Sequence, residues 1–264
     1  MDKAYEHFSA ASTTWSNRYS QTPRNIWDLD LVLRREHLHR MLALLFAEKN
    51  GQKVVVLDAG CGTGDALDGI SREQVAVVGF DVVPDMVQVS ASRHPEDTYR
   101  TASFEDLPFE PGSKDVVICL GVLEYLGDVP EAIRRVHEEL RAGGQFIVSF
   151  PNGASWLRKL SRWIVGVEEF AATTIRRLQG RQRNTSLPQY AHRSWTLGEV
   201  EHLLVANGFD VEQVMFNTVG VSGWLGNMRP AIKLSRWWTE RYRESRRTGA
   251  RFGLTMLIRA RKRS

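Results

Sequence analysis

The sequence predicts an α/β fold with a largely parallel sheet. Three apolar, β-branched runs are typical of strands buried on both faces, at residues 53–58, 75–81 and 114–120. Segments with apolar residues at helical spacing are expected to form amphipathic helices at 27–46 and 130–141. Alternation of such strands and helices produces a sheet that is covered by helices.

The first strand runs directly into a glycine-rich turn, Asp-Ala-Gly-Cys-Gly-Thr-Gly at residues 58–64. Gly60, Gly62 and Gly64 would let the backbone turn tightly against a ligand. The dinucleotide-binding fingerprint has glycine at its first, third and sixth places, but Asp65 occupies the sixth. The turn therefore predicts a nucleotide-sized ligand other than a dinucleotide, with an ordinary strand-to-helix turn as the alternative.

A second strand-end carboxylate follows this turn. Asp81 closes the 75–81 strand roughly twenty residues later, where nucleotide-binding α/β folds place a ribose-binding acid. Its carboxylate can accept hydrogen bonds from both ribose hydroxyls, whereas a solvated Asp at a strand end is the alternative. Residues 66–72 are expected to form a helix whose N-terminus faces the ligand, and Pro84 is expected to begin the next helix.

Residues 58–64, together with Asp81 and the Leu-Pro-Phe block at 107–109, resemble the motifs of class I S-adenosylmethionine-dependent methyltransferases. The 140–152 segment is similar to that of the quinone-biosynthesis members of this superfamily. The resemblance covers residues 4–152 well and 190–264 loosely. It implies a Rossmann-like, seven-stranded, mostly parallel sheet with an antiparallel last strand, and an enzyme that transfers a methyl group from S-adenosylmethionine.

The resemblance also implies which residues bind this cofactor. They lie in the glycine-rich turn, at strand ends and in an N-terminal lid: Asp58, Gly60, Cys61, Gly62, Gly64, Asp81, Val82, Ser103, Phe104, Leu120 and Tyr19. Ser103 departs from the family, which has an adenine-binding Asp at this place, so Glu105 and Asp106 are alternatives for that contact. The lid is the aromatic segment 4–20, for which a terminal helix packed on the sheet is the alternative reading.

Charge divides the chain. Residues 1–150 hold 15 Lys and Arg against 23 Asp and Glu, whereas residues 151–264 hold 20 against 8, a net charge of +12. Six of the eight tryptophans lie in this basic part, and tryptophan with arginine is a mixture that membrane interfaces favour. A nucleic-acid partner is disfavoured because no RNA-binding module accompanies the basic residues.

An insert follows the 145–152 strand. One helical stripe in it holds six apolar residues, Trp156, Leu157, Leu160, Trp163, Ile164 and Val167. Either a lid helix over the substrate pocket or a helix lying in a bilayer surface would cover such a stripe, and the two are compatible. Residues 224–247, with three tryptophans and seven basic residues, are a second candidate for contact with a membrane surface.

The motifs specify the methyl donor, S-adenosylmethionine, and leave the identity of the methyl acceptor open. We expect methylation of an oxygen on a small, lipophilic or lipid-linked acceptor, with C- or N-methylation of a natural product as the alternative. A sensor or scaffold that binds S-adenosylmethionine without catalysis is the alternative from another class. His192 is the candidate base for a hydroxyl acceptor, or else a structural residue at the adjacent helix, and Arg193 is the candidate contact for an anionic acceptor group.

We expect a single domain over residues 1–264. Its parts are an N-terminal helical lid, a cofactor-binding half, the amphipathic insert and a C-terminal half with substrate-side elements, at 1–46, 47–152, 153–190 and 191–264. The chain begins without a signal peptide and has no apolar run of spanning length, so a cytoplasmic protein, peripheral at most, is expected. Cys61 and Cys119 have no partners at metal-binding spacing, so no metal site is expected. The oligomeric state is left open.

Overall fold

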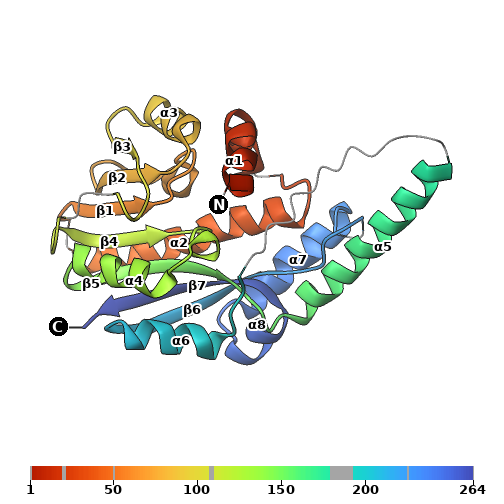
Figure 1. Ribbon diagram of the computed structural model, residues 1–264. Helices are drawn as coiled ribbons and strands as arrows, with labels where there is room; N and C mark the ends of the chain where they lie inside the picture. Colours follow the sequence, from red (N-terminus) through yellow and green to blue (C-terminus); the bar gives the residue numbers. More distant parts are fainter. Residues whose placement is uncertain are drawn as a thin grey trace.

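The computed structural model describes residues 2–19, 22–49, 51–106, 110–178, 193–224 and 226–263. Its centre is a seven-stranded sheet with the strand order β3-β2-β1-β4-β5-β7-β6 (Figure 1). The strands are β1 (Val54–Ala59), β2 (Val75–Asp81), β3 (Thr98–Thr101), β4 (Lys114–Cys119), β5 (Leu140–Pro151), β6 (Phe209–Val219) and β7 (Gly253–Lys262). All pairings are parallel except the two that β7 makes, which confirms the predicted Rossmann-like sheet with an antiparallel last strand.

Helices cover both faces of this sheet. They are α1 (Asp2–Trp15), α2 (Ile26–Glu48), α3 (Pro84–Arg93), α4 (Val129–Glu139), α5 (Trp156–Leu178), α6 (Leu197–Ala206), α7 (Arg229–Tyr242) and α8 (Arg246–Phe252). Apolar residues of α4 and α6 pack on one face, and those of α2 pack on the other. Because each strand alternates its side chains between two covered faces, the central strands are apolar almost throughout, as their sequences predict.

One predicted helix is wrong. Residues 66–72 do not form a helix; instead a single 3-10 turn, η2 (Asp65–Leu67), follows the glycine-rich turn. Gly69 adopts a positive φ of 84°, which interrupts any right-handed helix there. Carboxylates at both ends of the turn, from Asp65 and Asp68, are held by Arg93 rather than facing solvent as they would on a helix surface.

In the described part of the insert, α5 (Trp156–Leu178) is a helix that extends from the body of the molecule (Figure 1). The predicted apolar stripe on it divides into two lines. Ile164 is buried and Leu157 packs against a small core formed with α2 and α7, whereas the other four residues are exposed. The residues that the sequence predicts on one face of the helix therefore form a packed inner edge and an exposed outer edge.

Candidate functional site

A large cavity opens at the carboxyl ends of β1, β2 and β4, where the strand order reverses. Its volume is about 1450 Å³, and α1, α2 and α5 supply its other walls. Pockets for drug-sized ligands commonly span about 300–1,000 Å³. The cavity therefore has room for a nucleoside-sized ligand and a second molecule beside it.

The glycine-rich turn lies against the strand-end acid. Gly60 has a φ of 79°, and a Cβ on it would lie 2.2 Å from Val122 Cγ2, so no larger residue fits there. The Asp81 carboxylate accepts hydrogen bonds from Gly62 N at 2.9 Å and from Val83 N at 3.0 Å. Burial raises the pKa of Asp81, while these backbone donors act in the opposite direction. The carboxylate is thus fixed at the cavity wall with lone pairs left for a ligand.

A second acid, Asp58, lines the cavity from the end of β1. Burial, with a contribution from the negative charge of Asp81, raises the pKa of Asp58 to about 7. A site that holds two buried carboxylates close together is short of positive charge. It suits a ligand that carries a cation, as the sulfonium and ammonium of S-adenosylmethionine do.

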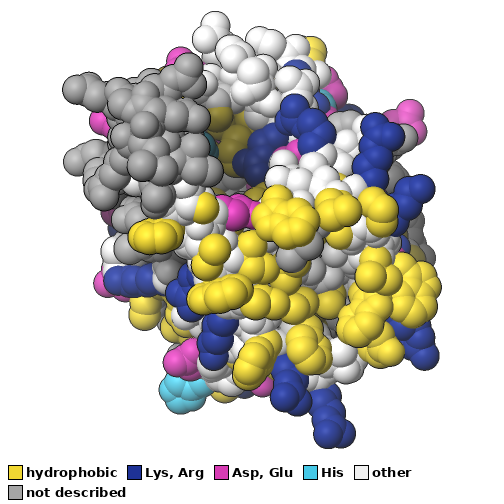
Figure 2. Space-filling view, turned by 90° about the vertical axis from the view of Figure 1, so that its right-hand side faces the viewer, with side chains coloured by type: hydrophobic (Ala, Val, Ile, Leu, Met, Phe, Trp, Pro, Cys, Tyr) yellow, Lys and Arg dark blue, Asp and Glu magenta, His cyan; other side chains and the backbone are white. Residues whose placement is uncertain are grey.

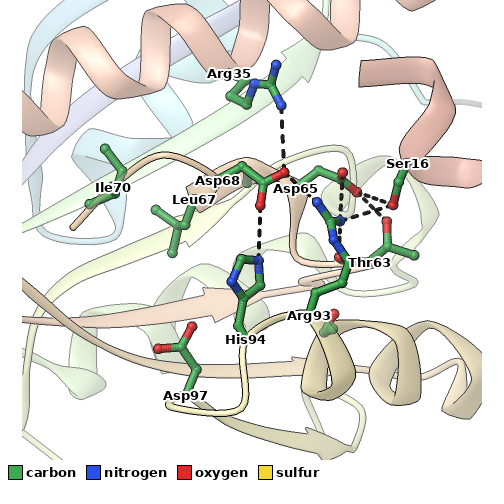
Figure 3. A network of polar contacts seen from close by, with 12 residues as sticks. Ser16, Arg35, Thr63, Asp65, Leu67, Asp68, Ile70, Arg93, His94 and Asp97 are labelled. Atoms are coloured by element: carbon green, nitrogen blue, oxygen red, sulfur yellow. Dashed lines mark hydrogen bonds and ion pairs between the residues drawn. The ribbon is translucent and has the colours of Figure 1, made fainter. Parts of the chain in front are cut away.

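An arginine that the sequence analysis missed ties the glycine-rich turn to the N-terminal segment (Figure 3). Arg93, the last residue of α3, donates from Nη1 to Thr63 O at 2.7 Å and to Asp65 Oδ1 at 2.7 Å. The same nitrogen donates to Ser16 Oγ at 3.0 Å, and Nη2 donates to Asp68. Asp65, which breaks the dinucleotide fingerprint, is therefore the buried partner of this arginine.

We expect Arg93→Ala to lower the free energy of unfolding by about 2 kcal/mol, the scale of hydrogen bonds to a charged group. The reason is that Asp65 would remain buried without its cation. Urea unfolding measures this loss. Arg134→Ala, which removes an exposed ion pair on α4, is the control and should cost less than about 1 kcal/mol. Equal losses in the two variants would contradict the role assigned to Arg93.

Most of the predicted cofactor residues line the cavity: Asp58, Gly60, Cys61, Gly62, Asp81, Val82, Ser103, Phe104, Leu120 and Tyr19. Gly64 does not line the cavity and lies against His94 instead. A Cβ on Gly64 would be 3.0 Å from His94 Cδ2. Burial raises the pKa of Tyr19 to about 12, so its hydroxyl stays protonated and can donate to a ligand.

Ser103 occupies the place of the family's adenine-binding acid. Its hydroxyl donates to Asp106 Oδ2 at 2.8 Å and accepts from the backbone of Glu105 and Asp106. The hydroxyl is thus occupied in a local turn, and the ring of neighbouring Phe104, buried against Phe80, offers an apolar surface to a base. The Leu-Pro-Phe block at 107–109 lies outside the described residues.

The N-terminal helix α1 forms a wall of the same cavity. Phe8 makes edge-to-face ring contacts with Trp15 at 5.3 Å and with Tyr125 at 5.7 Å between ring centroids. Ser9 Oγ donates to Asp85 Oδ2 at 2.7 Å, which attaches α1 to α3. These contacts place the aromatic segment over the strand ends, where a lid would lie.

Two further charged residues, which the sequence analysis did not single out, meet beside Gly121. A Cβ on Gly121, whose φ is 72°, would lie 2.9 Å from Arg34 Nη1 and 3.9 Å from Glu124 Oε1. Arg34 Nη2 donates to Asp30 Oδ2 at 2.6 Å, while its buried Nε finds no acceptor among the described residues. The buried Glu124 Oε2 likewise accepts no hydrogen bond from the part of the chain that the structure describes.

The protonation of Glu124 is sensitive to this environment. Burial raises its pKa, and the positive charge of Arg34 is the main opposing influence. A carboxylate with a raised pKa, a free oxygen and a place in a ligand cavity has the properties of a general base. A short 3-10 turn, η3 (Leu123–Tyr125), directly after β4 positions it.

Of the predicted catalytic pair, the structure describes Arg193 alone. His192 lies outside the described residues. Arg193 is exposed, donates to Gly127 O at 3.2 Å and does not line the cavity. Among the arginines that do line it is Arg158 of α5, whose pKa is lowered by burial and whose Nη1 donates to Leu254 O at 3.4 Å.

A model for a methyltransferase domain matches residues 57–148 of this chain. A probable S-adenosylmethionine-dependent methyltransferase of Mycolicibacterium smegmatis is 29% identical over 61% of this chain and 53% of its own length. A ubiquinone biosynthesis O-methyltransferase of Xanthomonas euvesicatoria is 35% identical over 44% of this chain and 50% of its own. The chain thus spans about half the length of these relatives.

The fold extends the likeness over the full chain. The crystal structure of a magnesium protoporphyrin IX methyltransferase from Synechocystis, with bound S-adenosylhomocysteine, superimposes with a TM-score of 0.65. The superposition covers 99% of this chain and 98% of the Synechocystis protein, and the two sequences are 19% identical. The matched model identifies residues 57–148 as a methyltransferase domain, and the sheet order and the glycine-rich turn agree with the class I S-adenosylmethionine-dependent methyltransferases.

Proposed function

We propose that this protein transfers the methyl group of S-adenosylmethionine to an oxygen of a small, lipophilic acceptor. The observation that carries this proposal is that one cavity is lined by two unlike sets of residues. The first is the glycine-rich turn with Asp58 and Asp81, and the second comes from α1 and α5, with Glu124 also in the wall. A donor and an acceptor would lie in contact there, shielded from water.

The residues present fit the cofactor. Asp81 would hold the ribose hydroxyls, Phe104 would pack on the base, and the backbone at Leu120 and Gly121 would flank the methionyl end. Arg34, with its unused Nε and with Nη1 at Gly121, would hold the carboxylate of that end. The cofactor supplies an activated methyl group, so the chain's own task is to align the acceptor and exclude water.

We propose Glu124 as the base that takes the proton of a hydroxyl acceptor. Glu124 lines a cavity that has room for a second molecule, its buried Oε2 accepts no hydrogen bond from the described residues, and Arg34 favours its ionised form. His192 remains the alternative base predicted from the sequence. Oxygen is preferred over carbon or nitrogen as the methylated atom because a hydroxyl needs such a base, and the matched ubiquinone biosynthesis protein is an O-methyltransferase by name.

The walls that α1, α2 and α5 supply support a lipophilic acceptor. Phe8, Trp15, Trp27 and Val165 line the cavity there, so the surface offered to a second molecule is largely apolar, and Arg158 would hold an anionic group on it. Arg193, as the contact first predicted for such a group, stays a proposal. The rival is a sensor or scaffold that binds the cofactor and transfers nothing.

Incubation with radiolabelled S-adenosylmethionine and an extract of bacterial cells tests the proposal. We expect base-stable label in the organic-solvent fraction, in proportion to the amount of protein added. Label in the aqueous fraction alone would replace the lipophilic acceptor with a polar one. Tight cofactor binding by calorimetry without labelled product from any extract would favour the sensor or scaffold.

A further inference from the structure

Helix α5 presents an exposed apolar line. Trp156, Leu160, Trp163 and Val167 are 62%, 41%, 67% and 49% exposed. Their spacing of four, three and four residues places them on one side of the helix, along about three turns. A water-soluble helix normally places charged residues on the side away from its core, so this arrangement is the reverse of the usual one.

The exposure is not the result of a helix that hangs loose. On the adjoining inner side, Ser161 Oγ accepts a hydrogen bond from Ser222 N at 2.9 Å. Leu157 packs against the small core that contains Ile232 of α7. Ile164, one turn beyond Ser161, is buried as well. The orientation of α5 about its axis is therefore fixed by its inner side, and the tryptophans are held outward.

The exposed line continues onto neighbouring elements. Five large apolar side chains of the loop before α7 and of α7 itself are 39–62% exposed: Trp224, Met228, Leu234, Trp237 and Trp238. Trp224 N donates to Glu168 Oε1 of α5 at 2.7 Å, which joins this loop to α5. Figure 2 shows hydrophobic side chains spread across this side of the molecule, with Lys and Arg at its edges. We call these residues and the α5 line the aromatic face.

Four basic side chains beside this face have no acidic partner among the described residues. Lys159, Arg162, Arg229 and Lys233 are exposed, and none of them pairs with an acidic residue that the structure describes. Tryptophan prefers the headgroup region of a bilayer, and Lys and Arg are attracted to anionic headgroups. No helix among the described residues is long and apolar enough to cross a membrane. The chemistry is that of contact with one leaflet.

We propose that the aromatic face binds the surface of an anionic lipid bilayer, from which the acceptor reaches the cavity. The proposal rests on the proposed function, because it names the source of the lipophilic acceptor. The third side of α5 provides the connection: Arg158, Val165 and Gly166 line the cavity. A molecule at the membrane surface would thus have one helix between it and the site, with the basic Arg162 at the boundary.

Vesicle co-sedimentation tests this directly and needs no acceptor. With vesicles of equal parts phosphatidylcholine and phosphatidylglycerol, we expect binding of the full chain that falls with salt, and little binding to pure phosphatidylcholine. The double variant Trp156→Glu, Trp163→Glu should bind about tenfold more weakly or worse, because it places two charges in the contact. Val205→Glu, at an exposed apolar residue of α6, is the matched control and should bind as the unaltered chain does.

Calorimetry with S-adenosylhomocysteine on each variant separates this proposal from the proposed function. Unchanged cofactor affinity in the double variant shows that the fold and the site survive. The bilayer proposal is overturned if the unaltered chain ignores anionic vesicles, or if Val205→Glu weakens binding equally. It is also overturned if sedimentation velocity shows a dimer that only the double variant abolishes, because the aromatic face would then be a subunit interface. Loss of cofactor binding in the unaltered chain would instead contradict the proposed function.

Discussion

Glu124→Gln is expected to lower the rate of methyl transfer by about 10²–10⁴-fold, the usual contribution of a positioned general base. The amide preserves the shape of the side chain but cannot take a proton. Single-turnover incorporation of label into the lipid fraction measures the rate. Affinity for S-adenosylhomocysteine should stay within about threefold of the original, since the proposed contacts to the cofactor come from other residues.

The pH profile supplies a second readout of the same residue. The base must be ionised to act, so the rate should rise with pH through the raised pKa of Glu124 and then level off. In Glu124→Gln this limb should disappear. Glu131→Gln, at an exposed residue of α4, is the control. If His192→Asn abolishes the limb and Glu124→Gln keeps it, His192 is the base and Glu124 only neutralises Arg34.

Asp81→Asn is expected to weaken binding of S-adenosylmethionine by roughly one to three orders of magnitude, or about 1.4–4 kcal/mol. Asn keeps one acceptor oxygen but loses the charge and the second acceptor. It also leaves either Gly62 N or Val83 N without a partner, which loosens the glycine-rich turn. Isothermal titration calorimetry measures the affinity.

Asp210→Asn provides the comparison for this change. Asp210 is an exposed acid that pairs with Arg263 at the β6 edge of the sheet. Loss of the Asp210 charge should therefore leave the affinity for the cofactor unchanged. Equal affinity for the cofactor in Asp81→Asn and the unaltered chain would remove Asp81 from the site and, with it, the ribose contact that the family resemblance implies.

The sheet could be predicted from the sequence because its signals are local. Apolar runs such as 114–119 are typical of strands that are covered on both faces. The turn at 58–64 needs its glycines because its backbone adopts positive φ angles at those positions. The missing helix after that turn could not be predicted in the same way. The positive φ of Gly69 interrupts it, and the carboxylates beside the turn are held by Arg93, which is distant from them in sequence.

The cofactor end of the site was likewise easier to predict than the acceptor end. Asp81 follows its strand at a separation that backbone topology dictates. Arg34 and Glu124 lie in a helix and a short turn with ordinary local sequence, and their meeting beside Gly121 is a property of tertiary packing. The signal that could have found Glu124 was its place directly after the β4 strand, at the edge where nucleotide-binding sheets hold their ligands.

Arg93 also has a consequence for motion. It joins a turn at the start of the chain, at Ser16, to the backbone carbonyl of Thr63, with side chains from Asp65 and Asp68 between them. Segments held by one shared group open together rather than separately. Native-state hydrogen exchange should therefore find α1 and the glycine-rich turn in one cooperative unit, with equal opening free energies that rise together when the cofactor binds.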